Sequence, residues 1–323
     1  MKKFIIKATK VSLLLFLLSF LACGNVQKKE KLTEIDIKQS EPFFKISLAQ
    51  WSFNKHIRSG EMSPFDFAKK ASELGFEGVE YVSQLYTNEI EKLGFEAVID
   101  SLKNESEKYN IKNVLIMVDE EGDLADPDVD IRNKAVENHK KWVDAAKYLG
   151  CHAIRVNTFG TNDPEIWKET VKDGLTKLSK YAATKNINVL VENHGWLSSD
   201  APKLMKVIKS IDMSNCGTLP DFGNWCVKRI NNERWGECLE EYPDKYEGIQ
   251  LMMQAAKAVS AKSYDFDKNG KETTIDYIRM LQIVKDAGYK GFIGVEYEGS
   301  RLSEEEGIIA TKELLLAAAK QLN

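Results

Sequence analysis

The sequence is poor in cysteine and histidine, with five of the former and four of the latter among 323 residues. No two cysteines are spaced as CxxC, which excludes the paired thiols of zinc ribbons and dithiol redox sites. An excess of one charge is also lacking: 45 basic and 49 acidic residues give a formal net charge of −4 and no basic field for nucleic acid. No glycine-rich phosphate turn follows the first predicted strand, which argues against a dinucleotide-binding open sheet.

The N-terminus carries an apolar run, Val11 to Leu21, that is too short to span a bilayer. Four lysines precede this run, and Leu21-Ala22-Cys23-Gly24 ends it. The arrangement resembles the bacterial lipoprotein signal, in which the cysteine becomes the lipidated first residue; an ordinary secretory signal cut nearby is the alternative. We predict a signal peptide over residues 1–22, a flexible tether over 23–41 and a folded domain over 42–323. The protein is then exported and held by lipid on Cys23, at the periplasmic or cell-surface side of a bacterial membrane.

A short apolar run in the middle of the chain ends abruptly in polar side chains: Val189-Leu190-Val191-Glu192-Asn193-His194-Gly195. This composition is typical of a buried parallel strand that leads into an active site. A period of two places Glu192 and His194 on the same side of the strand. Two later predicted strands also end on carboxylates, Asp221 and Glu296. A single such glutamate is as readily a helix cap or a solvated charge, but three converging carboxylates indicate a functional site.

Predicted strands and helices alternate along the chain. The strands are expected at residues 43–49, 78–81, 111–118, 153–156, 189–192, 216–220, 256–262 and 291–295. Eight such units predict an α/β fold, a single (β/α)₈ TIM barrel with its active site at the C-terminal strand ends. One long helix is expected at about residues 89–109, and a long loop after Asp221 leads into a helix near residues 242–253. Cys226 and Cys238 share this loop and can pair in an oxidising compartment.

Five stretches near the predicted strand ends are informative when they occur together. They are Ser47-Leu48-Ala49-Gln50-Trp51-Ser52, Leu74-Gly75-Phe76-Glu77-Gly78-Val79-Glu80, Val191-Glu192-Asn193-His194-Gly195, Pro220-Asp221-Phe222-Gly223-Asn224 and Val295-Glu296-Tyr297-Glu298-Gly299. Together they resemble the sugar phosphate isomerase/epimerase family with the xylose-isomerase-like TIM barrel. The resemblance covers nearly all of residues 43–321.

This resemblance implies a divalent metal at the barrel mouth, held by Glu, Asp, His and Glu from the last four strands. Three residues match the carboxylate positions: Glu192, Asp221 and Glu296. At the histidine position stands Ser260, and Lys262 shares its face. Clustered carboxylates do not all stay ionised in a low-dielectric pocket without a compensating positive charge. Either a metal bridges them, with His194 as a replacement ligand, or Lys262 supplies the positive charge. An oxygen-rich set suits Mn²⁺ or Mg²⁺, and one histidine makes Zn²⁺ or Co²⁺ suitable as well.

The resemblance further implies an isomerase or epimerase that transfers a proton next to a sugar carbonyl. Glu192 and Glu296 are the expected proton-transfer pair, with Lys262 or the metal tuning them. The candidates for substrate binding are Trp51, Arg155, Asn157, His194 and Asn224. His194 is expected either as a metal ligand or as a hydrogen-bond donor to the substrate. Since no cluster of Lys or Arg is evident at the predicted mouth, a free sugar or keto-sugar is expected in place of a sugar phosphate.

Two other functions stay open at this stage. The same proton abstraction beside a ketone can drive β-elimination, which would make the protein a keto-glycoside lyase or hydrolase. A lipid-anchored sugar-binding protein without catalysis is favoured by the missing histidine and disfavoured by the three carboxylates. Endonuclease-like members of the same barrel class use more histidines to hold three metals, and four histidines disfavour that reading. No nucleic-acid partner is expected, and the sequence specifies no oligomeric state.

Overall fold

The computed structural model describes residues 41–322, in which eight parallel strands form one sheet. The strands are β1 (Lys45–Ala49), β2 (Gly78–Val82), β3 (Lys112–Val118), β4 (Ala153–Val156), β5 (Asn188–Glu192), β6 (Cys216–Leu219), β9 (Val259–Ser263) and β10 (Phe292–Tyr297). Their order in the sheet is β6-β5-β4-β3-β2-β1-β10-β9. Parallel bridges Thr218–Ala256 and Asp221–Ser260 join the two ends of this order. The ring of strands therefore closes, and the predicted α/β TIM barrel is confirmed.

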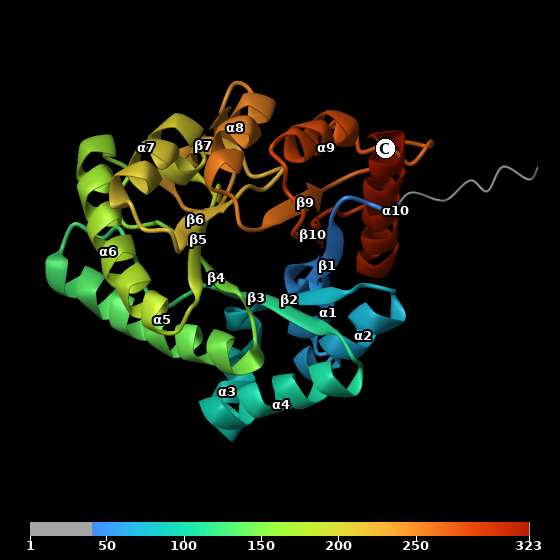
Figure 1. The fold of residues 1–323 in the computed structure, drawn as a ribbon, viewed down its shortest axis with the longest axis horizontal. Helices are drawn as coiled ribbons and strands as arrows, with labels where there is room; N and C mark the ends of the chain where they lie inside the picture. The colour runs from blue at the N-terminus through green and yellow to red at the C-terminus, as the bar shows by residue number, and fades with distance from the viewer. Residues whose placement is uncertain (1–40, 323) are drawn as a thin grey trace, which may run out of the picture. The chain divides into compact units, whose positions relative to one another are not determined.

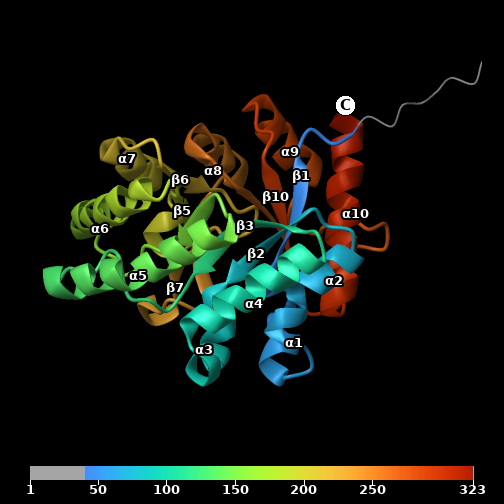
Figure 2. The same cartoon turned by 60° about the horizontal axis from the view of Figure 1, so that its bottom comes forward.

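Helices cover the outside of the strands, as Figures 1 and 2 show. They are α1 (Asn54–Ser59), α2 (Phe67–Glu73), α3 (Thr87–Leu93), α4 (Phe95–Lys108), α5 (Val129–Leu149), α6 (Pro164–Thr184), α7 (Ala201–Ile211), α8 (Lys245–Met252), α9 (Tyr277–Asp286) and α10 (Glu304–Leu322). Among residues 41–322, no helix has the length and apolar character needed to cross a bilayer.

Local sequence explains where the longest helices begin. Helix α6 starts at Pro164, which suits the first helical position, and the preceding Asp163 accepts hydrogen bonds from the backbone N–H of Glu165 and Ile166. Asp128 caps α5 in the same way. These caps satisfy amide groups that have no partner inside the helix, and they fix the points at which the chain leaves the βα loops of the barrel mouth.

Two regions differ from the sequence-based expectation. The single helix expected near residues 89–109 is two helices, because Gly94 adopts φ 87° and ψ 154° between α3 and α4. The long loop after Asp221 contains an antiparallel hairpin, β7 (Cys226–Arg229) paired with β8 (Cys238–Glu241). A disulfide joins Cys226 to Cys238 within this hairpin, with Cα atoms 5.8 Å apart, so the pairing left open by the sequence is formed.

The inward face of each strand changes from apolar to polar towards its C-terminal end. Leu190 and Leu219 belong to the apolar cluster inside the barrel, and Glu192 and Asp221 follow two residues later on the same face. The barrel interior is thus closed by packed side chains at one end and lined by charged side chains at the other.

The predicted signal peptide, the predicted lipidation site Cys23 and the predicted tether up to residue 40 lie outside the described residues.

Candidate functional site

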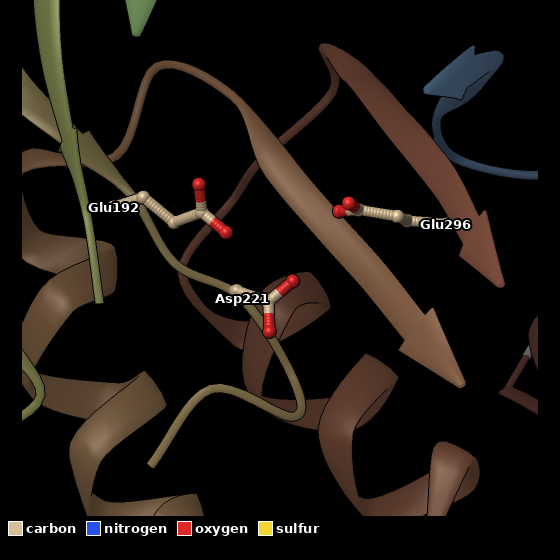
Figure 3. A group of neighbouring side chains, drawn as sticks. All are labelled: Glu192, Asp221 and Glu296. Atoms are coloured by element: carbon tan, nitrogen blue, oxygen red, sulfur yellow. The ribbon is translucent and has the colours of Figure 1, made fainter. Parts of the chain in front are cut away.

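Three buried carboxylates converge at the C-terminal ends of β5, β6 and β10. Glu192 is the last residue of β5, Asp221 follows β6, and Glu296 lies in β10; each is at most 3% exposed. One oxygen from each lies within 4.8 Å of one from each of the others. Figure 3 shows the carboxyl groups of Glu192 and Glu296 directed towards each other, with Asp221 beside both. Three carboxylates distant in sequence therefore form one group of oxygen atoms.

Strand β9 brings Ser260 and Lys262 into the same group. Nζ of Lys262 lies 3.5 Å from Oε1 of Glu296 and 4.0 Å from Oδ2 of Asp221. It also lies 3.3 Å from Oε1 of Glu298, two residues beyond Glu296 on the same strand face. The Ser260 hydroxyl donates to Oε2 of Glu296 at 3.1 Å. Ser260 thus stands beside the carboxylates where the family resemblance placed a histidine, and the ammonium of Lys262 stands next to it.

Burial and mutual charge set the protonation of this group. Burial raises the pKa of Glu296 well above its ordinary value, and the opposing effect of Lys262 does not cancel this rise. Burial also raises the pKa of Asp221 to about 6, again against the effect of Lys262. Burial alone would lower the pKa of Lys262, but the facing carboxylates outweigh it and raise the pKa well above the usual value. Lys262 is therefore a cation. Its single positive charge does not balance the three carboxylates that it faces, Asp221, Glu296 and Glu298.

A divalent cation fits the oxygen atoms of this group. Oδ2 of Asp221 is buried, and within residues 41–322 it accepts no hydrogen bond. Such an atom costs free energy unless a proton or a cation compensates it. Carboxylate oxygens at this spacing suit Mg²⁺ or Mn²⁺. The residues that would hold the ion are Glu192, Asp221 and Glu296.

Arg155 and its neighbours form the adjoining side of the site. Arg155 Nε lies 2.8 Å from Oε2 of Glu192, and its Nη1 donates to Oδ1 of Asp119 at 2.8 Å. Asn157 Nδ2 donates to the same Asp119 oxygen at 2.6 Å. Burial favours protonation of Asp119, but Arg155 outweighs it and lowers the pKa of that carboxyl. Asp119, which the sequence analysis did not single out, therefore orients both predicted substrate-binding residues of β4.

His194 joins this network as a neutral imidazole. Burial, reinforced by Arg155 and Lys262, lowers the pKa of His194 to about 3. Its Nδ1 lies 2.7 Å from Oδ1 of Asn157. The amide nitrogen of Asn157 donates to Asp119, which fixes the orientation of the amide group. Because an amide oxygen only accepts, Nδ1 carries the proton and Nε2 presents a lone pair. In this tautomer the ring offers an acceptor or a ligand atom at Nε2, and both roles expected from the sequence stay predictions.

The remaining predicted site residues also lie here. Asn224 Nδ2 donates to Oε1 of Glu192 at 3.0 Å. Trp51 lines the same cavity as Arg155, Asn157 and His194. The structure thus brings together every residue that the sequence suggested, while their roles stay predictions.

Glu298 and Asp119 were not predicted as site residues, although the sequence pattern around each indicates an inward-facing position. Each continues the inward face of a strand by two residues, Glu298 after Glu296 on β10 and Asp119 after Met117 on β3. Glu298 faces Lys262, and although burial opposes it, that ammonium lowers the pKa of the Glu298 carboxyl.

A further carboxylate, Glu80 of β2, lies inside the barrel. Its Oε1 accepts from the Ser47 hydroxyl at 2.6 Å, and burial raises its pKa to about 7. Gly294 of β10 leaves room for it, because a Cβ there would stand 2.6 Å from the carboxylate oxygen. Glu80 thus bonds to β1 and packs against β10, so it joins these strands inside the barrel.

The cavity above the carboxylates has a volume of about 790 Å³. Four arginines line it: Arg58, Arg155, Arg229 and Arg234. The expectation that the mouth has no basic cluster is therefore wrong; these residues come from α1, β4 and the β7–β8 hairpin, and only the fold brings them together. Six carboxylates line the same cavity, namely Asp119, Glu120, Glu121, Asp123, Glu296 and Glu298. Acidic side chains outnumber the guanidinium groups, so the cavity does not favour a dianionic phosphate.

Comparisons with known proteins agree with this fold. Residues 68–318 match the family described as xylose isomerase-like TIM barrel. The uncharacterized protein MJ1311 of Methanocaldococcus jannaschii is 26% identical over 151 residues, which are 43% of this chain and 48% of that protein. The chain thus spans about half the length of this curated relative.

Solved structures of low sequence identity share the fold. D-psicose 3-epimerase of Clostridium cellulolyticum H10, solved with D-tagatose, superposes with a TM-score of 0.61 at 16% identity, covering 85% of this chain and 96% of that one. The 3-keto-D-glucoside 4-epimerase YcjR of E. coli gives 0.62 at 15%, covering 84% and 98%.

A xylose isomerase-like TIM barrel protein of Mycobacterium smegmatis, in complex with magnesium, gives a TM-score of 0.61 at 17% identity, covering 87% of this chain and 99% of that one. At these identities the likeness shows the fold alone, whereas the family match extends over most of the barrel. The chain belongs to the xylose isomerase-like TIM barrel family.

Proposed function

We propose that the protein is a carbohydrate isomerase or epimerase that moves a proton next to the carbonyl of a keto-sugar. The observation that carries this proposal is the convergence of Glu192, Asp221 and Glu296, with Lys262, beside a cavity that Glu296 lines. Carboxylates on two sides of a bound sugar can remove a proton from one face and return it from another. The family supports this chemistry, since relatives of the same fold include named sugar epimerases.

A divalent metal at the three carboxylates would polarise the sugar carbonyl and the neighbouring hydroxyl, which acidifies the C–H bond between them. Glu192, Asp221 and Glu296 would hold it, with Mn²⁺ or Mg²⁺ preferred by an all-oxygen set. Nε2 of His194 offers a nitrogen that would extend the choice to Zn²⁺ or Co²⁺.

The chain's own residues divide the proton transfer between them. Glu192 is oriented by Asn224 and Arg155 and is the base that takes the proton. Glu296 has a raised pKa and is the acid that returns it. The ammonium of Lys262, held within 4.0 Å of two of the carboxylates, places a fixed positive charge where negative charge develops on the sugar oxygens.

The substrate class follows from the charge of the cavity. A neutral sugar meets acidic and amide acceptors for its hydroxyl groups, and Trp51 offers an aromatic face for its ring. A free sugar or keto-sugar therefore fits better than a phosphorylated one.

The decisive measurement is exchange of the C–H proton beside the carbonyl for deuterium, followed by NMR in D₂O over a panel of ketohexoses and keto-glycosides. We expect exchange by the native protein, loss of exchange in Glu192→Gln and Glu296→Gln, and no change in Glu91→Gln, a surface control on α3. The absence of exchange with every sugar in the panel would reject the proposal.

Elimination of a glycosidic substituent is the second candidate, because it begins with the same proton abstraction. The volume of about 790 Å³ favours it, since this space exceeds the need of a single sugar ring. Release of an alcohol or a second sugar, detected in the same NMR experiment, would identify a lyase in place of an isomerase.

We also propose that the protein is exported and anchored by lipid on Cys23. The disulfide between Cys226 and Cys238 supports an oxidising compartment. Cys23→Ala should move the protein from the membrane fraction to the soluble fraction of the producing cells. A variant that stays membrane-bound would show that the lipoprotein assignment is mistaken.

A further inference from the structure

We infer that the outer part of the cavity is a second sugar subsite built around Trp235, so that the ligand is a two-ring glycoside. This inference rests on the proposed function, because it assigns the first ring to the carboxylates. It concerns the hairpin β7–β8, which the proton-transfer site does not use.

The hairpin is closed by one internal cross-link and held against the barrel mouth by two contacts. The Cys226–Cys238 disulfide closes its base. The indole Nε1 of Trp196 donates to the carbonyl oxygen of Glu233 at 3.0 Å, and Arg234 forms an ion pair with Asp123 of the loop after β3. Trp235 directly follows Glu233 and Arg234 in sequence, and its ring packs against Phe159 and His194, so contacts with the barrel mouth set its position at the cavity.

Trp235 presents an open aromatic surface to the cavity. Its ring centroid is 5.0 Å from that of His194 and 5.4 Å from that of Phe159, both at tilted or edge-on angles. The residue lines the cavity yet stays 53% exposed. An indole held in place at this exposure has a free face, and aromatic faces pack against the C–H surfaces of sugar rings.

Arg229 supplies a polar group at the same place. Its Nη1 donates to the carbonyl oxygen of Gly236, but its Nε is buried and has no hydrogen-bond partner within residues 41–322. Arg229 also lines the cavity. A guanidinium N–H left without an acceptor there is available to a hydroxyl oxygen of a bound ring.

The cavity has room for two rings. Its volume of about 790 Å³ lies in the upper part of the range, about 300–1,000 Å³, that holds drug-sized ligands. Trp51 follows β1, and His194, against which Trp235 packs, follows β5; these strands lie on opposite sides of the ring of strands. One ring can therefore lie over the carboxylates beside Trp51, and a second ring beside Trp235.

Calorimetric binding tests the subsite without requiring turnover. The probes are the disaccharides lactulose, maltulose, cellobiose and sucrose, each compared with its component monosaccharides. The variants are Trp235→Ala, Trp235→Phe and, as a control, Tyr148→Ala, an exposed aromatic on the outer helix α5.

We expect at least one disaccharide to bind more tightly than its components. Trp235→Ala should weaken that disaccharide by about three- to tenfold and leave the monosaccharides within about twofold. Trp235→Phe should recover part of the loss, and Tyr148→Ala should change nothing.

The inference is overturned if no disaccharide binds more tightly than its components, or if Trp235→Ala weakens both classes equally. If a disaccharide binds as expected but its C–H proton does not exchange, then the subsite is supported and the proposed isomerase activity is rejected. The two claims can therefore fail separately.

Discussion

Arg155 Nε lies 2.8 Å from Oε2 of Glu192, and both side chains are buried. The same guanidinium bonds to Asp119, so one cation compensates two acidic groups away from water. Buried ion pairs add little to stability when complete, but breaking one leaves an uncompensated charge.

Arg155→Met should therefore lower the free energy of unfolding by about 3–5 kcal/mol, measured by urea denaturation. The control is Lys92→Met, which breaks the exposed pair with Glu89 and should cost about 0–1 kcal/mol. Equal losses in the two variants would contradict the structural role of Arg155.

Lys262→Met should tighten the binding of Mn²⁺ by at least about tenfold, because it removes a positive charge within 4.0 Å of two predicted ligand carboxylates. It should also lower kcat by about 10²–10³-fold, as loss of a group that stabilises developing charge does. Calorimetry and turnover are measured side by side. No Mn²⁺ binding by the native protein, together with an inactive Lys262→Met, would show that the lysine acts in place of a metal.

Ser260→His should tighten Zn²⁺ or Mn²⁺ binding by at least about tenfold, because the serine hydroxyl already lies 3.1 Å from Glu296 and imidazole is the better ligand. Ser260→Ala is the matched control, since it removes the hydroxyl without adding a nitrogen. If both variants bind metal alike, then Ser260 does not occupy a ligand position.

Glu80 should make stability depend on pH between about 4.5 and 7. Its folded pKa is raised to about 7 by burial from an ordinary 4.5, so in this window the folded chain keeps a proton that the unfolded chain has released. Stability therefore falls as the pH rises through the window, by about 3 kcal/mol, and is steady above it. Glu80→Gln should abolish this fall in urea denaturation curves at pH 5, 6 and 7.5.

Ser47→Ala serves as the companion variant. It removes the hydrogen bond that favours the ionised form of Glu80, so the fall should extend to higher pH. The assignment would be contradicted if the Glu80 contribution, taken as the difference between the native protein and Glu80→Gln, increased the free energy of unfolding between pH 5 and 7.

Much of the barrel was predictable because its signals are local. Each buried strand is a short apolar run, and Pro164 and Gly75 mark a helix start and a helix end within one or two residues. The carboxylates Glu192, Asp221 and Glu296 were predictable for the same reason: each stands where an apolar run stops, and a parallel barrel gathers such ends on one side.

The hairpin and the arginines were not predictable in this way. Strands β7 and β8 are four residues long, carry charged side chains and pair outside the barrel sheet, so they show no alternation to detect. Arg58 of α1 and Arg229 and Arg234 of the hairpin reach one cavity only through the paths of the chain after β1 and β6. Loop paths depend on long-range contacts such as that between Arg234 and Asp123, and no local pattern encodes these.

Lys262 provides a positive charge beside the carboxylates that does not depend on a bound ion. An ion held by carboxylates obeys mass action, so its occupancy follows the free metal concentration around the protein. A side chain on β9 is present in every folded molecule at a fixed stoichiometry, and chelators cannot withdraw it. Part of the positive charge beside the carboxylates is therefore independent of the metal content of the surroundings.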